Sequence, residues 1–296
     1  MKLSHITLLF LLFNGVASTL LAQFPDTDIM LYRMEKSGSG NIEIFSGENI
    51  TNRKGYDNQP VFSPAGDKII YVSISEKDST QSDLMEYDIA TGNTKQLTKT
   101  KESEYSPTFS SDGKKLFVVH VDVDSGQRLY SMTWPELNNL TRIENSDSVG
   151  YFGLLDSGKV AMFLISEPPR MVILDLSTHK SQFICNEPGR CMRTTAAYPG
   201  QMLYIDKSDS LHWFLKSCNT TDFTKKIIAE MPGLTEDFTV LNDGTLLCGM
   251  NGTLYRLSNG KKDWLAVHGA KEEKFPAFKR IATDRMAKRM AIVISK

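Results

Sequence analysis

The side chains best suited to chemistry in this 296-residue sequence are its histidines and the carboxylates beside them. His120 is followed in alternation by Asp122 and Asp124, and imidazole with carboxylates can ligate zinc or calcium. The other histidines show no ligand spacing; they are His5, His179, His212 and His268. We therefore interpret residues 120–124 as a solvated hairpin end and expect no metal and no other cofactor.

Nucleophilic catalysis has no sequence support either. A serine hydrolase of the kind that accompanies some repeat domains needs a Gly-x-Ser-x-Gly turn and about 200 further residues. The sequence contains no such pentapeptide. We predict that the protein is not an enzyme. A metal-dependent carbohydrate-active enzyme, of lyase or lactonase type, stays as the alternative and would require three or more histidine or carboxylate side chains to converge.

Four cysteines are present, and four cysteines allow three pairings. Cys185 and Cys191 are closest in sequence and flank Pro188-Gly189, so they are the predicted disulfide. The alternative for Cys218 and Cys248 is a role as small buried apolar side chains.

Two stretches of the sequence repeat each other. Residues 60–68 read Pro-Val-Phe-Ser-Pro-Ala-Gly-Asp-Lys, and residues 107–115, at an offset of 47, read Pro-Thr-Phe-Ser-Ser-Asp-Gly-Lys-Lys. A period of this length indicates a repeat architecture built from one supersecondary unit. We interpret the first copy as four strands, at residues 60–63, 68–74, 83–89 and 94–98. The second is apolar on both faces, as expected of a strand buried between neighbouring sheets.

A turn glycine and an outer strand recur even in the repeats whose sequences are no longer similar to the first two copies. The glycines are Gly66, Gly113, Gly158, Gly200 and Gly244. Each precedes an apolar strand, and a turn with positive φ favours glycine. The matching third strands are expected at residues 28–32, 83–87, 128–132, 170–174, 210–214 and 253–257.

The ends of the sequence do not match whole units. It begins with a third strand at 28–32 and ends with Pro276-Ala277-Phe278, which matches Pro60-Val61-Phe62, followed by an apolar strand at 290–294. Joined, these ends complete one blade and close a ring without open sheet edges. The predicted fold class is all-β: a six-bladed β-propeller of four-stranded antiparallel blades, about 46 residues each, over residues 23–296. A parallel solenoid is the alternative, but the first and last units of a solenoid do not pair, so incomplete units that complement each other are not expected in it.

The first 22 residues are typical of a signal peptide. Lys2 and His5 precede an apolar run at residues 6–13, and small residues follow at Gly15, Ala17 and Ala22. We expect no transmembrane segment after signal removal, and a soluble monomer in the periplasm or outside the cell. Because 34 basic and 35 acidic residues nearly balance, no nucleic-acid partner is expected.

The segment 60–73, Pro-Val-Phe-Ser-Pro-Ala-Gly-Asp-Lys-Ile-Ile-Tyr-Val-Ser, resembles the motif of the TolB-like branch of the WD-repeat-like (PD40-type) propellers. Ala65 replaces the aspartate of that motif, whereas Asp112 keeps it in the second copy. The resemblance is strong over residues 50–121 and implies an exported propeller that binds proteins at the bacterial envelope, or one attached to a hydrolase. TolB carries a helical domain before its propeller that is not expected here, so its own envelope role is not carried over.

The loops that lead into the inner strands are the predicted binding surface, because long connections on a rigid scaffold carry recognition. They hold Tyr56, Asp57, Glu104, Tyr105, Tyr151, Phe152, Arg193, Glu236, Asp237, Lys274 and Phe275. Aromatic side chains mixed with charges suit contact with a protein or a glycan. The alternative is that the tyrosines pack between blades. The basic stretch from Lys279 to Arg289 is interpreted as a solvated hairpin, with an acidic partner as a second possibility.

These observations predict a non-catalytic propeller that acts as a protein-binding or scaffold module at the bacterial cell envelope. A propeller that senses a small ligand is a further alternative, which a deep polar pocket in the channel would favour.

Overall fold

A computed structural model of the protein describes residues 24–37, 40–75, 78–156, 158–267 and 275–296. Throughout these ranges the regular elements are β-strands, and none of the described residues forms a helix that could cross a membrane. The predicted signal peptide, residues 1–22, lies outside the described residues.

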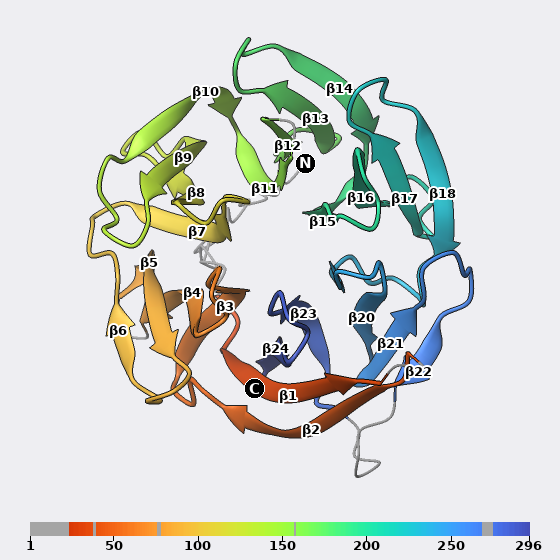
Figure 1. The fold of residues 1–296 in the computed structure, drawn as a ribbon. Helices are drawn as coiled ribbons and strands as arrows, with labels where there is room; N and C mark the ends of the chain where they lie inside the picture. Colours follow the sequence, from red (N-terminus) through yellow and green to blue (C-terminus); the bar gives the residue numbers. More distant parts are fainter. Residues whose placement is uncertain (1–23, 38–39, 76–77, 157, 268–274) are drawn as a thin grey trace, which may run out of the picture.

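The strands form antiparallel sheets arranged around a central space (Figure 1). Four sheets have four strands each. Their strands are β7 (Ser103–Phe109), β8 (Lys115–Val121), β9 (Gln127–Thr133) and β10 (Thr141–Asp147); β11 (Val149–Leu155), β12 (Lys159–Leu164), β13 (Arg170–Asp175) and β14 (Ser181–Asn186); β15 (Pro188–Arg193), β16 (Gln201–Asp206), β17 (Phe214–Asn219) and β18 (Lys225–Glu230); and β19 (Phe238–Val240), β20 (Leu246–Met250), β21 (Thr253–Leu257) and β22 (Leu265–Val267). This pattern is consistent with a propeller.

The remaining sheet has eight strands in two halves. One half contains β3 (Gly55–Phe62), β4 (Lys68–Ser75), β5 (Asp78–Asp88) and β6 (Thr94–Gln96). The other contains β23 (Phe278–Thr283), β24 (Arg289–Ser295), β1 (Thr27–Lys36) and β2 (Ile42–Asn49). A single parallel pair, Thr27 with Tyr56, joins the halves.

The two ends of the described chain lie side by side. β1 and β24 pair antiparallel over seven residues, from Thr27 opposite Ser295 to Arg33 opposite Arg289. Segments 28–34 and 290–294 therefore share a sheet, as the incomplete terminal units predict.

The predicted turn glycines have the expected conformation. Their φ angles are 73° at Gly66, 70° at Gly113, 69° at Gly158, 67° at Gly200 and 83° at Gly244. A side chain is strained in this region, so the turns kept glycine while the rest of the repeat diverged.

Two details of the predicted repeat are wrong. The third strand expected at 210–214 begins only at Phe214, because Asp209 accepts hydrogen bonds from the N–H groups of Leu211 and His212 and forms a turn there. The segment Pro276-Ala277-Phe278 is not the equivalent of Pro60-Val61-Phe62. It stands where β23 begins, whereas Pro60-Val61-Phe62 ends β3.

The apolar core lies between neighbouring sheets. Val72 and Leu84 pack with Leu116 and Val118 of the next sheet, and equivalent clusters follow at each later sheet boundary. Further clusters join β20 and β21 to β23 and β24, and join β24 and β1 to β4. Second strands such as β4 are buried on both faces, which explains their continuous apolar runs.

Candidate binding site in the central cavity

The inner strands β3, β7, β11, β15, β19 and β23 surround a cavity of about 530 Å³. Each contributes residues of the strand and of the turn that follows it. At β19 the lining begins at Asp237, one residue before the strand, and leaves out Phe238. The first lining residues of the six strands are Gln59, Ser106, Tyr151, Arg190, Asp237 and Arg280. The side chains of all six carry a polar group.

These six residues contact one another in three pairs. The backbone N–H of Ser106 donates to Oε1 of Gln59, and both residues have positive φ in bulged strands. Arg190 donates to Asp237, with 3.0 Å between Nε and Oδ2. Arg280 donates to the hydroxyl of Tyr151 over 3.4 Å.

The Arg190–Asp237 pair neutralises itself. Burial alone would lower the pKa of Arg190, but the charge and hydrogen bond of Asp237 raise it above its ordinary value. Glu236 adds a second carboxylate 3.5 Å from Arg190 and also pairs with Lys207 at 3.1 Å. The predicted residues Glu236 and Asp237 are therefore engaged inside the protein.

Arg280 and Tyr151 form a different kind of contact. The guanidinium carbon of Arg280 lies 5.5 Å from the centre of the Tyr151 ring, a cation–π distance. Burial raises the pKa of Tyr56, and the charge of Arg280 opposes that rise. The basic stretch around Arg280 is thus more than a solvated hairpin.

Of the predicted binding residues, the cavity is lined by four: Tyr151, Phe152, Arg193 and Asp237. The structure buries several others in the core or in polar contacts; those less than a tenth exposed include Tyr56, Asp57, Glu104 and Phe275. Tyr105 packs partly buried between two clusters. Lys274 lies outside the described residues.

Asp57 and Glu104 illustrate why these side chains are not presented to a partner. Asp57 accepts a 2.5 Å hydrogen bond from Arg53, and burial raises the pKa of Asp57 despite that charge. Glu104 accepts hydrogen bonds from the hydroxyls of Thr98 and Thr100, and burial raises the pKa of Glu104 as well. Both carboxylates are therefore buried and hydrogen-bonded to other residues of the protein.

Sequence reasoning missed Gln59, Ser106 and Arg190, and it considered Arg280 only as part of the basic stretch from Lys279 to Arg289. Two of them stand one residue before the prolines of the repeated Pro-x-Phe-Ser motif, at Pro60 and Pro107. That equal offset was a usable signal for β3 and β7. Arg190 and Arg280 have no such marker. The motif is not recognisable in β15, and Pro276-Ala277-Phe278 was aligned with the wrong part of β3.

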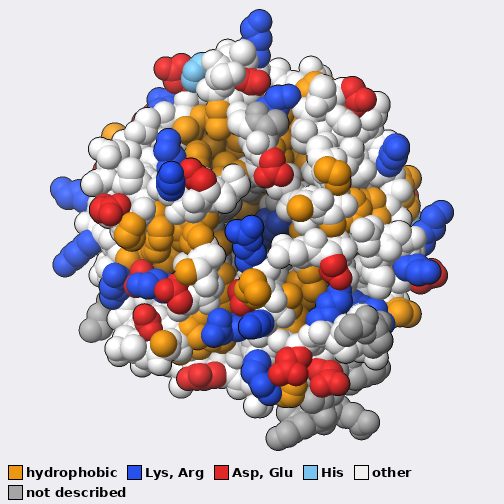
Figure 2. All heavy atoms as spheres, in the orientation of Figure 1, with side chains coloured by type: hydrophobic (Ala, Val, Ile, Leu, Met, Phe, Trp, Pro, Cys, Tyr) orange, Lys and Arg blue, Asp and Glu red, His pale blue; other side chains and the backbone are white. Residues whose placement is uncertain are grey.

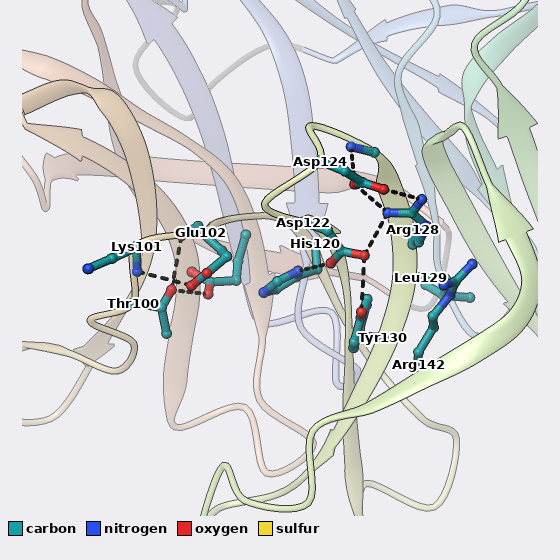
Figure 3. A network of polar contacts seen from close by, with 12 residues as sticks. Thr100, Lys101, Glu102, His120, Asp122, Asp124, Arg128, Leu129, Tyr130 and Arg142 are labelled. Carbon is teal, nitrogen blue, oxygen red and sulfur yellow. Dashed lines mark hydrogen bonds and ion pairs between the residues drawn. The ribbon is translucent and has the colours of Figure 1, made fainter.

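The residues around His120 form a polar network rather than a solvated hairpin end (Figure 3). Asp122 contacts Nδ1 of His120 at 2.7 Å and accepts hydrogen bonds from Arg128 at 2.7 Å and from the Tyr130 hydroxyl at 3.2 Å. Burial would raise the pKa of Asp122, but these partners lower it overall. Arg128 also binds Asp124 and, in β10, Asp147. The network thus fastens the β8–β9 connection to β10.

Among the described residues, no group of three or more histidine, cysteine, aspartate or glutamate side chains is arranged so that it could hold a metal ion.

The predicted disulfide is absent, and all four cysteines are free thiols. Cys185 lies opposite Met171 within one sheet, whereas Cys191 belongs to the next sheet and its thiol donates to the carbonyl of Phe238. They pack in different clusters, because the chain changes sheet between them. Burial raises the pKa of Cys185 to about 12.

One face of the sheets carries exposed apolar side chains. Because neighbouring strands are antiparallel, the start of the first strand, the connection between the second and third, and the end of the fourth lie at one edge of each sheet. We call the side formed by these edges the inlet face. Five of the ten large apolar side chains exposed among the described residues belong to its segments: Phe24, Val123, Ile165, Leu211 and Leu234.

Basic and apolar side chains are distributed unevenly on the face of the molecule that surrounds the central space. Figure 2 shows basic side chains gathered at the centre of the molecule, with apolar patches around them.

No protein-family model and no curated protein matches this sequence. Its fold does resemble solved structures. The protein assigned as TolB from Agrobacterium tumefaciens has a TM-score of 0.67 at 8% identity, covering 92% of this chain and 99% of that one. An auxiliary nutrient binding protein from Bacteroides thetaiotaomicron has a TM-score of 0.58 at 8% identity, covering 90% and 76%.

TolB from Acinetobacter baumannii has a TM-score of 0.57 at 13% identity. The match covers 90% of this chain but only 63% of that protein. At such low identities the likeness concerns the fold alone. The chain therefore has the TolB-like fold that these propeller proteins share.

Proposed function

We propose that this protein is an exported, non-catalytic propeller that binds a partner protein through its inlet face. In this proposal the ring has six four-stranded blades, and the blade made of β23, β24, β1 and β2 closes it. The pairing of β1 with β24 and the apolar clusters at successive sheet boundaries support closure. The predicted signal peptide and the TolB-like fold support a periplasmic or secreted location and a monomer.

The observation that carries the binding role is the exposure of large apolar side chains on the inlet face. Val123 is 91% exposed and Leu211 is 78% exposed, and they come from connections in two different sheets. Large apolar side chains exposed on several connections of one face of a rigid scaffold can each anchor a protein partner. A partner that covers them would gain apolar burial without reordering the sheets.

The test is capture of a partner from envelope extracts of the source organism by the tagged full chain. The variant V123D/L211D places charges on the inlet face, and F183D/I227D is its matched control. Phe183 and Ile227 are also exposed but lie on the outer strands β14 and β18. We expect the same protein to be captured by the unaltered chain and by the control, and to be lost with V123D/L211D.

Equal capture by both variants, with both folded by circular dichroism, would assign the contact to another surface. Mass spectrometry of the purified chain tests export separately: a mature N-terminus near residue 23 is expected, and an intact Met1 in material from the envelope fraction would contradict it.

A further inference from the structure

We propose that the central cavity is a binding site for a small anion bearing a carboxylate or a phosphate, and that Arg280 recognises its charge. This site is separate from the protein contact on the inlet face.

The position of Arg280 is the first step. It lies on β23, and β11 lies on the other side of the central space (Figure 1). The guanidinium of Arg280 contacts the ring and the hydroxyl of Tyr151 on β11. The side chain therefore stands inside the ring of strands rather than on its rim. A ligand inside the cavity can therefore contact the guanidinium.

The charges that line the cavity do not cancel locally. Its aspartates are Asp156, Asp237 and Asp284, and its arginines are Arg190, Arg193, Arg280 and Arg285. Asp237 is held by Arg190. Asp284 accepts hydrogen bonds from the N–H groups of Lys288 and Arg289, and Asp156 is exposed at the turn after β11.

Within the described ranges, neither Arg280 nor Arg193 has a carboxylate oxygen within 4.0 Å. Two arginines thus face the cavity with their positive charges unmatched at contact distance.

The hydrogen-bonding capacity of Arg280 is also mostly unused. A guanidinium has five N–H donors in a planar fork, which matches the oxygens of a carboxylate or a phosphate. Among the described residues, the one side-chain hydrogen-bond partner of Arg280 is Tyr151, at the long distance of 3.4 Å. An anion could therefore bind the guanidinium while the ring of Tyr151 keeps its cation–π contact.

The remaining lining supplies neutral polar groups. The hydroxyls of Thr239 and Thr283 lie 3.0 Å apart, and both residues line the cavity. Gln59 adds an amide. Small-molecule sites have volumes of roughly 300 to 1,000 Å³, and the cavity, at about 530 Å³, lies within that range.

The test is calorimetric titration of the full chain with citrate, with inorganic phosphate and with glucose as an uncharged probe. We expect one or both anions to bind with an affinity that falls as sodium chloride rises, and glucose not to bind. The R280Q variant should weaken the anion at least tenfold, because a charged hydrogen bond is lost. The matched control is R170Q, since Arg170 is an exposed arginine of β13 outside the cavity.

Binding of neither anion to the unaltered chain, or equal affinity in R280Q and R170Q, would overturn the proposal. Should R280Q fail to fold, R280K serves instead: it keeps the charge but lacks the planar fork, so weaker binding than in R170Q is expected and equal binding would count against the site. Capture of a partner protein should persist in R280Q, since the apolar inlet face is unchanged. The two proposals therefore fail independently.

Discussion

Arg280 lies over the ring of Tyr151 at 5.5 Å, although the two residues are 129 positions apart and come from strands on opposite sides of the central space. Each residue belongs to a different sheet, so the contact links two sheets that share no strand pairing. It exists only because the sheets curve around a common centre.

This contact should contribute to stability through the ring and not through the hydroxyl. Tyr151→Phe keeps the ring and loses only the 3.4 Å hydrogen bond, so we expect a change in the free energy of unfolding below about 0.5 kcal/mol. Tyr151→Ala loses the cation–π contact and the packing on Phe163, which should cost about 3 kcal/mol. Urea unfolding measures both; equal costs would show that the hydroxyl dominates.

The pairing of the chain ends should be a stability determinant. Ile292 of β24 is fully buried between β1 and β23, and Ile292→Ala should lower the free energy of unfolding by about 3 kcal/mol. Val123→Ala is the control, because a side chain 91% exposed should change stability by less than about 0.5 kcal/mol. A cost below about 1 kcal/mol for Ile292→Ala in denaturant titrations would argue against tight packing of β24 between β1 and β23.

Two turn glycines offer a matched pair. At Gly158 a Cβ would meet nothing within 4 Å, so Gly158→Ala should cost only the strain of positive φ, about 1 kcal/mol. At Gly244 a Cβ would lie 2.8 Å from Nδ2 of Asn259 and 2.9 Å from the Cβ of Ala197. Gly244→Ala should therefore cost roughly twice as much by thermal or urea unfolding, and the reverse order would contradict the turn geometry.

The turn between β23 and β24 has an alanine at the position that Gly66 occupies between β3 and β4. The N–H of Ala287 donates to the carbonyl of Asp284, just as the N–H of Gly66 donates to that of Ser63, and Ala287 has a φ of 54°. Because glycine adopts this conformation without strain, Ala287→Gly should raise the free energy of unfolding by up to about 1 kcal/mol. A lower melting temperature for this variant would contradict the expectation.

Glu104 should make stability depend on pH. Burial raises the pKa of Glu104 above 4.5, so the folded state holds its proton more tightly than the unfolded state does. Its contribution is therefore fully present below pH 4.5 and is lost as the pH rises through the raised pKa. Glu104→Gln should remove this loss and be at least as stable as the unaltered chain at neutral pH.

The control for that series is Glu144→Gln, since the Glu144 side chain is 75% exposed. Parallel unfolding curves between pH 4 and 8 for the unaltered chain and Glu104→Gln would show that Glu104 is not the responsible group.

The cysteines should behave as free thiols. Without reductant, the denatured chain should react with four equivalents of a thiol reagent, and the folded chain should react slowly because burial raises the pKa of Cys185 to about 12 and of Cys218 to about 11. Two missing equivalents, with a crosslink mapped to Cys185 and Cys191, would restore the predicted disulfide.

The sequence by itself determined the repeat, the all-β class, the turn glycines and the pairing of the two ends. These follow from local rules: positive φ selects glycine at positions such as Gly66, and burial on both faces selects the apolar run of β4. Because the repeat unit is incomplete at each end of the sequence, the strands at the two ends are the natural partners of each other.

Only the tertiary structure decided which polar residues meet. Arg280 and Tyr151, or Arg190 and Asp237, come together because inner strands from separate repeats converge on one cavity. The spacing of the repeat does not distinguish a side chain that faces this cavity from one that is buried. Asp57 and Glu104 are of the buried kind. The direction of a side chain depends on strand register and bulges, and those are set by packing between sheets rather than by the motif.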